Sequence, residues 1–341
     1  MPADRIRNVA LVGHRGSGKT SLNEALLYEA GAVNRLGSVA DETTVSDSAP
    51  DEKARQMSIA SSLASFQWEE RKVNLIDTPG EPSFVADAMA ALRVCESAVF
   101  VVNGVMGVEV NTDRLWQRAK ELGLARLIFV NMLDRERADF FRTLEQLKES
   151  FGPHAVATEI PIGAEHEIRG VIDLIDMKAY EYEGADRDNC REIPIPDDMA
   201  ATADEYREKL IDEVAENSDE LMEHYLEGQE ISHEEMVSTL KEGVTGGRLF
   251  PITCGVATKN MAVNRLLDAF VEDLPSPVMA GAVEAGAVTL EPDPDAEMVT
   301  FVFKTLADPF AGRINLFRVY QGTLRPDTQA YNSRTHSKER I

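Results

Sequence analysis

The sequence has few cysteines, no long apolar run and a shortage of positive charge. Its three cysteines, Cys95, Cys190 and Cys254, are far apart and lack metal-ligand or redox spacing, which argues against a disulfide framework. No apolar stretch approaches the roughly 18 residues of a membrane span, and no signal-peptide core follows the charged N-terminus. We therefore expect a soluble, cytoplasmic protein with no membrane partner.

Acidic residues outnumber basic ones by 59 to 35, a net charge of −24. Such a surface repels phosphate backbones, so we expect no general nucleic-acid binding and no sequence-specific DNA binding. Residues 186–242 alone hold 19 acidic and five basic residues, which is more than half of the excess. A solvated helical surface explains this segment, and a docking face for a basic protein partner is the alternative.

Apolar residues make up 43% of the chain, enough for a packed core. The first 150 residues alternate apolar strands with helical segments, which predicts an α/β fold with a doubly wound parallel sheet. The strands are expected at residues 6–13, 72–77, 97–103 and 126–131, and the helices at 18–30, 82–95, 108–122 and 139–151. Residues 35–60 are polar without periodicity, which predicts a mobile loop.

From residue 156 the pattern changes to short β segments and two acidic helices, at 198–228 and 233–243. The α/β pattern then resumes with a strand at 249–255 and a helix at 262–274. We interpret 156–248 as an α+β subdomain inserted into a domain of residues 1–274. Residues 275–296 are rich in Pro, Gly and Ala and are expected to be a linker. The alternating stretch 297–341 is short for a closed barrel, so we expect an incomplete β-barrel domain.

Residues 13–20 read GHRGSGKT, the pattern G-x-x-x-x-G-K-[ST], directly after a predicted strand and before a predicted helix. In such a P-loop, backbone amides and the helix N-terminus face the phosphates of a nucleotide. Lys19 is expected to contact the β- and γ-phosphates, and the Thr20 hydroxyl to bind Mg²⁺. The predicted nucleotide-binding residues here are Gly13, His14, Arg15, Gly16, Ser17, Gly18, Lys19, Thr20 and Ser21.

Two further motifs follow predicted strands. Asp77 begins the sequence DTPG, where its carboxylate is expected to hold Mg²⁺ through water and the Gly80 amide to sense the γ-phosphate. Asn131 and Asp134 form N-x-x-D, and a carboxylate there can accept from the N1 and N2 donors of guanine, which adenine lacks. A helix-capping turn is the alternative interpretation of N-x-x-D alone. Together the motifs predict GTP or GDP with Mg²⁺ and oppose an ATP-dependent kinase.

With these motifs in order, the chain resembles the elongation factor G family of translational GTPases along nearly its whole length. The similar segments are RLGSVADETTVSD, LWQRAKELGLARLIFVN, LDRERADF, IPIGAE, LLDAFVEDLPSP and LADPFAGRINLFRVYQGTL. The resemblance implies a P-loop GTPase domain with the family's inserted subdomain, followed by the start of a β-barrel second domain. It also implies the ribosome as partner, with the ribosomal stalk meeting the acidic insertion.

The chain departs from the family's motifs at several positions. Glu81 stands where the family has the His that positions the attacking water, and Met132 where it has a Lys over the guanine ring. Gly16 replaces an Asp of the P-loop. Ser58 replaces the Thr of the first switch that binds Mg²⁺. The segment Gly255-Val256-Ala257 ends in Val-Ala where the family has the Ser-Ala of its last guanine motif, so the expected contact there is through backbone.

Three hypotheses follow for the chemistry, in which Lys19 and Glu81 are the catalytic candidates. The first is a GTP-binding translation factor homologue with slow or altered hydrolysis, because Glu81 adds negative charge near the phosphates. The second is a fully active GTP-hydrolysing translocase in which Glu81 orients the water as a base. The third is a nucleotide-dependent binding or regulatory protein without hydrolysis, whose switches act only as a latch.

Overall fold

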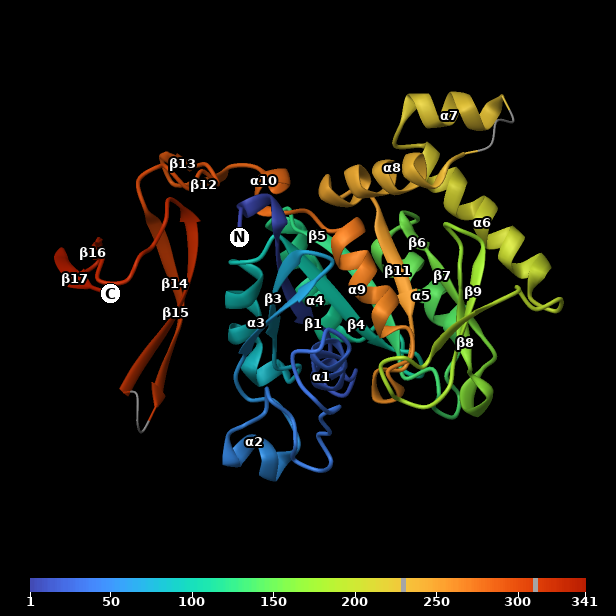
Figure 1. Ribbon diagram of the computed structural model, residues 1–341, viewed down its shortest axis with the longest axis horizontal. Helices are drawn as coiled ribbons and strands as arrows, with labels where there is room; N and C mark the ends of the chain where they lie inside the picture. The colour runs from blue at the N-terminus through green and yellow to red at the C-terminus, as the bar shows by residue number, and fades with distance from the viewer. Residues whose placement is uncertain (228–230, 309–311) are drawn as a thin grey trace. The chain divides into compact units, whose positions relative to one another are not determined.

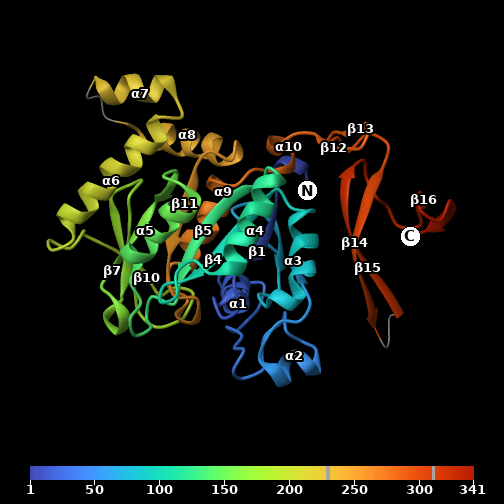
Figure 2. The same cartoon turned by 180° about the vertical axis from the view of Figure 1, so that it is seen from behind.

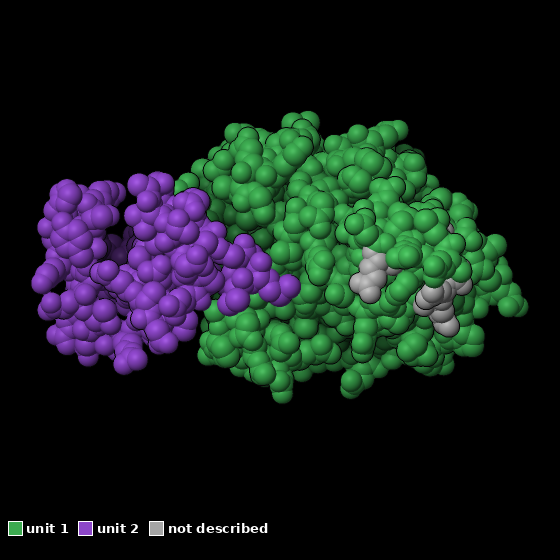
Figure 3. All heavy atoms as spheres, turned by 90° about the horizontal axis from the view of Figure 1, so that it is seen from above, with its two compact units in different colours: residues 1–276 green, residues 277–341 purple. Residues whose placement is uncertain are grey.

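The computed structural model describes residues 1–227, 231–308 and 312–341, and it divides into two compact units, Met1–Ser276 and Pro277–Ile341, coloured separately in Figure 3. Gly228, the predicted end of an acidic helix, and residues 309–311 of the family-like tail lie outside the described residues.

Unit 1 is built on a seven-stranded sheet with the order β2-β3-β1-β4-β5-β11-β6. All neighbours are parallel except β2 and β3, which pair antiparallel. The strands are β1 (Ile6–Val12), β2 (Ser62–Trp68), β3 (Arg71–Asp77), β4 (Ser97–Asn103), β5 (Ala125–Asn131), β6 (Ala155–Ala157) and β11 (Phe250–Cys254). β4 and β5 are almost continuously apolar because both faces of a parallel sheet are covered. The predicted α/β fold is confirmed.

Helices cover both faces of this sheet (Figures 1 and 2). On one face lie α1 (Lys19–Glu29) and α9 (Val263–Glu272), and on the other α3 (Val85–Leu92), α4 (Val110–Glu121) and α5 (Phe140–Phe151). α5 is amphipathic and buries Phe140, Leu144, Leu147 and Phe151, which share one helical face. Trp116 of α4 stacks on Phe151 at 3.9 Å between ring centroids, which ties two of these helices together.

The inserted segment has its own antiparallel sheet, in the order β10-β9-β8-β7, and three helices. Its elements are β7 (Glu159–Ile162), β8 (Gly170–Asp173), β9 (Lys178–Tyr182), β10 (Cys190–Ile193), α6 (Ala200–Ala215), α7 (Asp219–Leu226) and α8 (His233–Thr245). The structure has two helices where the sequence predicted one over 198–228. The Ser218 hydroxyl accepts from the Leu221 amide at 3.3 Å, so a new helix begins after Ala215.

The stretch 35–60, predicted as a loop, contains the short helix α2 (Pro50–Arg55). The Glu52 side chain stabilises it by accepting from the amides of Ile59 and Ala60 at 3.0 and 3.2 Å. Apolar periodicity cannot reveal such a helix because it buries one polar side chain rather than an apolar face.

Unit 2 begins in the stretch expected to be a linker, which carries α10 (Pro277–Ala280) and a hairpin of β12 (Val283–Ala285) and β13 (Val288–Leu290). Two antiparallel pairs follow, β14 (Val299–Asp308) with β15 (Gly312–Gln321) and β16 (Gln329–Asn332) with β17 (Ser337–Arg340). Within the described residues, no helix has the length and apolarity needed to cross a membrane.

Candidate nucleotide-binding site

The carboxyl ends of the parallel strands bring the predicted motifs to one edge of the sheet. In the parallel register, Leu11 of β1 lies beside Asp77 at the end of β3, and Asn103 beside Asn131 at the ends of β4 and β5. Ligands of open α/β sheets bind outside these carboxyl ends. The P-loop, DTPG, N-x-x-D and the segment after β11 therefore converge.

The P-loop closes on the carbonyl of His14. That oxygen accepts from the Ser17 hydroxyl at 3.0 Å and from the Lys19 ammonium at 2.8 Å. Gly18 has a φ of +89°, and a Cβ there would lie 2.3 Å from the Asn131 amide nitrogen, so only glycine fits. The loop thus turns tightly into α1, whose first residue is Lys19.

A cavity of about 230 Å³ opens between the P-loop, the segment after β3 and the stretch 35–60. The predicted site residues that line it are Arg15, Gly16, Gly18, Lys19, Thr20, Ser21, Ser58, Gly80, Glu81 and Met132. Two lining residues, Val39 and Asp47, were not singled out from the sequence, because no pattern marks individual side chains in that polar stretch. Gln56 and Met57 also line the cavity, as departures from the family's first-switch sequence R-G-I-T, which appears here as Arg55-Gln56-Met57-Ser58.

Buried charge concentrates at the phosphate end of this cavity. Burial lowers the pKa of Lys19, and the Asp77 carboxylate partly offsets that shift. Burial likewise raises the pKa of Asp77 to about 7, and the nearby Lys19 ammonium and Thr20 hydroxyl partly offset that shift. Asp77 is 2% exposed, and neither carboxylate oxygen makes a hydrogen bond of good geometry within the described part of the chain. Buried ionisable groups are costly without partners, so this end favours a ligand that brings both negative charge and a cation.

The predicted Mg²⁺ ligands lie close together. The Thr20 and Ser58 hydroxyl oxygens are 2.9 Å apart, although they come from α1 and from the stretch after α2. With the unpartnered oxygens of Asp77, they offer the hard oxygen donors that Mg²⁺ prefers. The donor set fits the predicted cation, and the ligand assignment stays a prediction.

At the base end, Asn131 is a structural link. Its side chain is 2% exposed, donates to the Ser17 carbonyl at 3.0 Å and accepts from the Ala257 amide at 3.0 Å. These two bonds join the P-loop to the last guanine motif. The Ala257 amide, whose backbone was expected to contact guanine, is therefore already paired, and the buried Val256 exchanges backbone bonds with Met261. The preceding Gly255 donates its amide to the Val130 carbonyl.

Asp134 and Met132 have different surroundings. The Asp134 carboxylate lies 3.6 Å from the ammonium of Lys259, a residue that the sequence analysis did not single out. Met132 has a left-handed φ of 62°, and its sulfur accepts from the Asn103 amide group at 3.5 Å. Met132 lines the cavity and keeps an apolar surface there.

Glu81 follows DTPG and caps the 3₁₀ turn η2 (Pro82–Phe84). Its carboxylate lies 3.2 Å from the guanidinium of Arg15 in the P-loop. Both residues were predicted at the site from the sequence, but their ion pair was not. Their opposite charges, at two motif positions expected next to the phosphates, could have indicated it.

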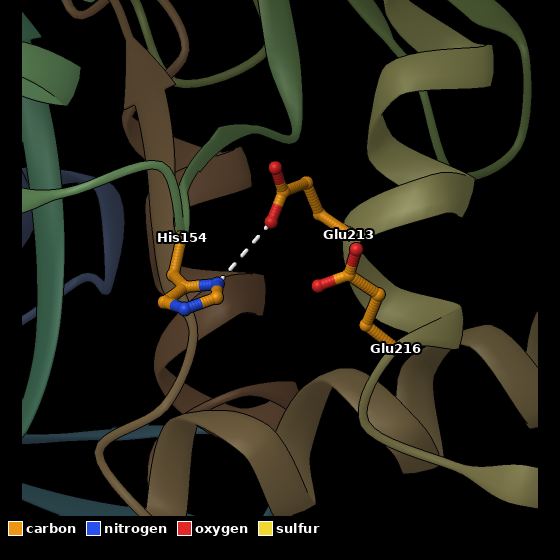
Figure 4. Close-up of side chains that lie close together, drawn as sticks. All are labelled: His154, Glu213 and Glu216. Carbon is orange, nitrogen blue, oxygen red and sulfur yellow. Dashed lines mark hydrogen bonds and ion pairs between the residues drawn. The ribbon is translucent and has the colours of Figure 1, made fainter.

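Two other features lie outside this cavity. A larger cavity of about 480 Å³ is lined by residues around the start of α5 and η3 (Glu165–Glu167) and contains none of the predicted site residues. His154, Glu213 and Glu216 gather at the end of α6, where a His154 ring nitrogen and a Glu213 oxygen are 3.2 Å apart (Figure 4). All three side chains are partly or fully exposed, and the ion pair joins His154 to Glu213 without involving Glu216.

Comparison with known proteins tests the resemblance. The model of the elongation factor Tu GTP binding domain family matches residues 4–276. The chain belongs to this family. The GTP-binding domain family thus covers all of unit 1 except its first three residues.

Two relatives named elongation factor G are similar to this member of the family. That of Ureaplasma parvum serovar 3 is 39% identical over 340 residues, and that of Mycoplasma pneumoniae is 37% identical over the same length. Each match covers 98% of this chain and 49% of the relative, so the chain spans about half the length of these relatives. A crystal structure from Thermus thermophilus matches with a TM-score of 0.88 at 32% identity, covering 99% of this chain and 48% of that one. The predicted resemblance to elongation factor G, a translational GTPase, is confirmed.

Proposed function

We propose that the chain binds GTP and GDP with Mg²⁺ in the 230 Å³ cavity and acts as the GTPase domain of an elongation-factor-G-like translation factor. The observation that carries this proposal is the buried, unpartnered Asp77 carboxylate beside Lys19 and the Thr20–Ser58 hydroxyl pair. Phosphates and a cation supply what these groups lack. Thr20, Ser58 and Asp77 would hold Mg²⁺, which would supply positive charge against the phosphates.

Asp134 is the group that we assign to guanine. It is two residues along the chain from Met132 of the cavity lining, and its carboxylate lies 3.6 Å from the ammonium of the half-exposed Lys259. Calorimetric titration with GTP, GDP and ATP in the presence of Mg²⁺ tests the assignment. We expect both guanine nucleotides to bind well ahead of ATP, and equal affinity for GTP and ATP would contradict it.

Hydrolysis is proposed to be slow. A carboxylate at position 81 adds negative charge beside phosphate oxygens that are already anionic, so repulsion should hold Glu81 away from the position of an attacking water. The Arg15 guanidinium neutralises part of this charge without changing the acceptor character of Glu81. GTP turnover measured with and without ribosomes tests the proposal, and we expect weak stimulation.

The proposed partner is the ribosome in the cytoplasm, because both relatives compared above carry the name elongation factor G. The acidic insertion is proposed to dock on a basic face of the ribosomal stalk. Reversing several charges within 205–223, on α6 and α7, should slow association with ribosomes, most at low salt, and leave nucleotide affinity unchanged. An unchanged association rate would make this segment a solvated helical surface.

A further inference from the structure

An ion pair between Arg15 and Glu81 links the P-loop to the segment that follows DTPG. Arg15 belongs to the P-loop, and Glu81 follows DTPG and begins η2. The Arg15 Nη1 and Glu81 Oε2 atoms are 3.2 Å apart, with the two side chains 59% and 26% exposed. Both line the nucleotide cavity.

The backbone of Arg15 lies beside Gly80 and the Lys19 ammonium, at the end of the cavity that we assign to the phosphates. A Cβ at Gly80 would lie 2.3 Å from the Lys19 ammonium and 2.7 Å from the Arg15 amide, so these three residues meet at one point. The lysine of a P-loop contacts the β- and γ-phosphates. The terminal phosphate of GTP would therefore arrive beside the Arg15–Glu81 contact, whereas GDP would stop short of it.

The charges around the cavity favour a move of the Arg15 guanidinium from Glu81 to a bound phosphate. The charged side chains that line the cavity within the described residues are Arg15, Lys19, Asp47 and Glu81, so opposite charges balance before a nucleotide enters. An exposed ion pair changes an equilibrium constant by at most about fivefold. A guanidinium–phosphate contact is charge-assisted, frequently bidentate and stronger. Arg15 consequently gains by leaving Glu81 for a phosphate.

We propose that Arg15 is the residue that distinguishes GTP from GDP: it pairs with Glu81 when no γ-phosphate is present and transfers its guanidinium to that phosphate when GTP binds. The inference rests on the proposed nucleotide site. The transfer releases Glu81 and with it the start of η2, so the segment after DTPG has different contacts in the two nucleotide states. Arg15 thereby acts as a specificity-determining residue, and Glu81 as its competitor.

Equilibrium titration with GDP and with a non-hydrolysable GTP analogue tests this in the 341-residue chain. Arg15→Ala should weaken binding of the analogue by about tenfold and that of GDP little, since GDP lacks the phosphate that Arg15 contacts. Glu81→Gln should tighten binding of the analogue by about two- to fivefold, because Arg15 loses its competing partner. In the double variant this gain should disappear.

The matched control is the Arg118–Glu121 pair on α4, whose atoms are 2.9 Å apart and which does not line the cavity; Arg118→Ala and Glu121→Gln should change neither affinity. Equal losses for both nucleotides in Arg15→Ala, or a Glu81→Gln gain that persists without Arg15, would overturn the inference. Arg15→Lys keeps the positive charge but cannot make the two parallel hydrogen bonds of a guanidinium. Its affinity for the GTP analogue should lie between those of the unmodified chain and Arg15→Ala. If the unmodified chain bound neither nucleotide, the proposed function itself would fail.

Discussion

At the phosphate end of the cavity the Asp77 carboxylate is buried with no hydrogen bond in the described structure, whereas at the base end the buried Asn131 amide makes two. The base end is thus assembled before a ligand arrives. The phosphate end holds charges that a ligand must complete. We infer that substitutions at the phosphate end change nucleotide affinity whatever the base is, and that substitutions at the base end change which base is accepted.

The largest effect is expected for Lys19→Ala. The change removes the buried cation that we expect at the β- and γ-phosphates, and each charge-assisted contact is worth roughly 1.5–3 kcal/mol. GTP, GDP and ATP affinities should all fall, by on the order of a hundredfold, in a calorimetric titration. Lys120→Ala, at the exposed end of α4, removes the same charge elsewhere and is the control. Comparable affinities in the two variants would contradict the assigned phosphate end.

Asp134→Asn should change the affinity for guanine and leave the phosphate contacts unchanged. The amide cannot accept from both guanine donors, so GTP and GDP binding should weaken by about 1–3 kcal/mol. Binding of xanthine nucleotides should improve, because xanthine offers an acceptor to the new donor. Asp113→Asn, on the exposed side of α4, is the matched control. An equal loss for GTP and ATP would place Asp134 at the phosphate end and break the comparison.

Removing Mg²⁺ with a chelator should weaken GTP binding by about tenfold, as expected for the loss of one charge-assisted contact. The preference for GTP over ATP should stay the same, because the cation belongs to the phosphate end. Thr20→Val should abolish this Mg²⁺ dependence, whereas Thr202→Val, also half-buried and in a helix, should keep it. A chelator that changed base preference would show that the two ends are not independent.

The two ends also differ in how well the sequence predicted them. The P-loop and Asp77 were found because a Gly-rich turn between an apolar strand and a helix is a specific signal for phosphate binding. The links of Asn131 to Ser17 and Ala257 were missed, since hydrogen bonds between residues more than 100 positions apart follow from strand order rather than from local pattern. The Lys259 contact with Asp134 was missed for the same reason.

The fold shows the same division. Five parallel strands, β1, β3, β4, β5 and β11, were predicted from their apolar runs. The parallel strand β6 was missed because three residues are too few to show a pattern. β2 was missed because only Phe66 of its residues is buried, so it is not a continuous apolar run, and it pairs antiparallel at the sheet edge. α2 was missed because Glu52, rather than an apolar face, holds it in place.

The smallest change in affinity, and the sharpest test of chemistry, is expected for Glu81→His. In the structure the Glu81 carboxylate is occupied by Arg15 and offers no donor to a water beside the γ-phosphate. An imidazole can both donate and accept, so it can orient that water, and general acid–base groups typically contribute about 10²- to 10⁴-fold. Ribosome-stimulated turnover should therefore rise. GDP affinity should change little, and GTP affinity should rise by no more than the two- to fivefold expected when Arg15 loses its carboxylate partner.

Glu121→His, on the surface of α4, controls for the added imidazole. Unchanged turnover in Glu81→His would mean that other departures, such as Gly16 or Met57 in the same cavity, also block the chemistry. Brisk hydrolysis by the unmodified protein that is lost in Glu81→Ala would instead make Glu81 the group that activates water. The negative charge of Glu81 would then promote hydrolysis, because the carboxylate would accept the proton of the attacking water.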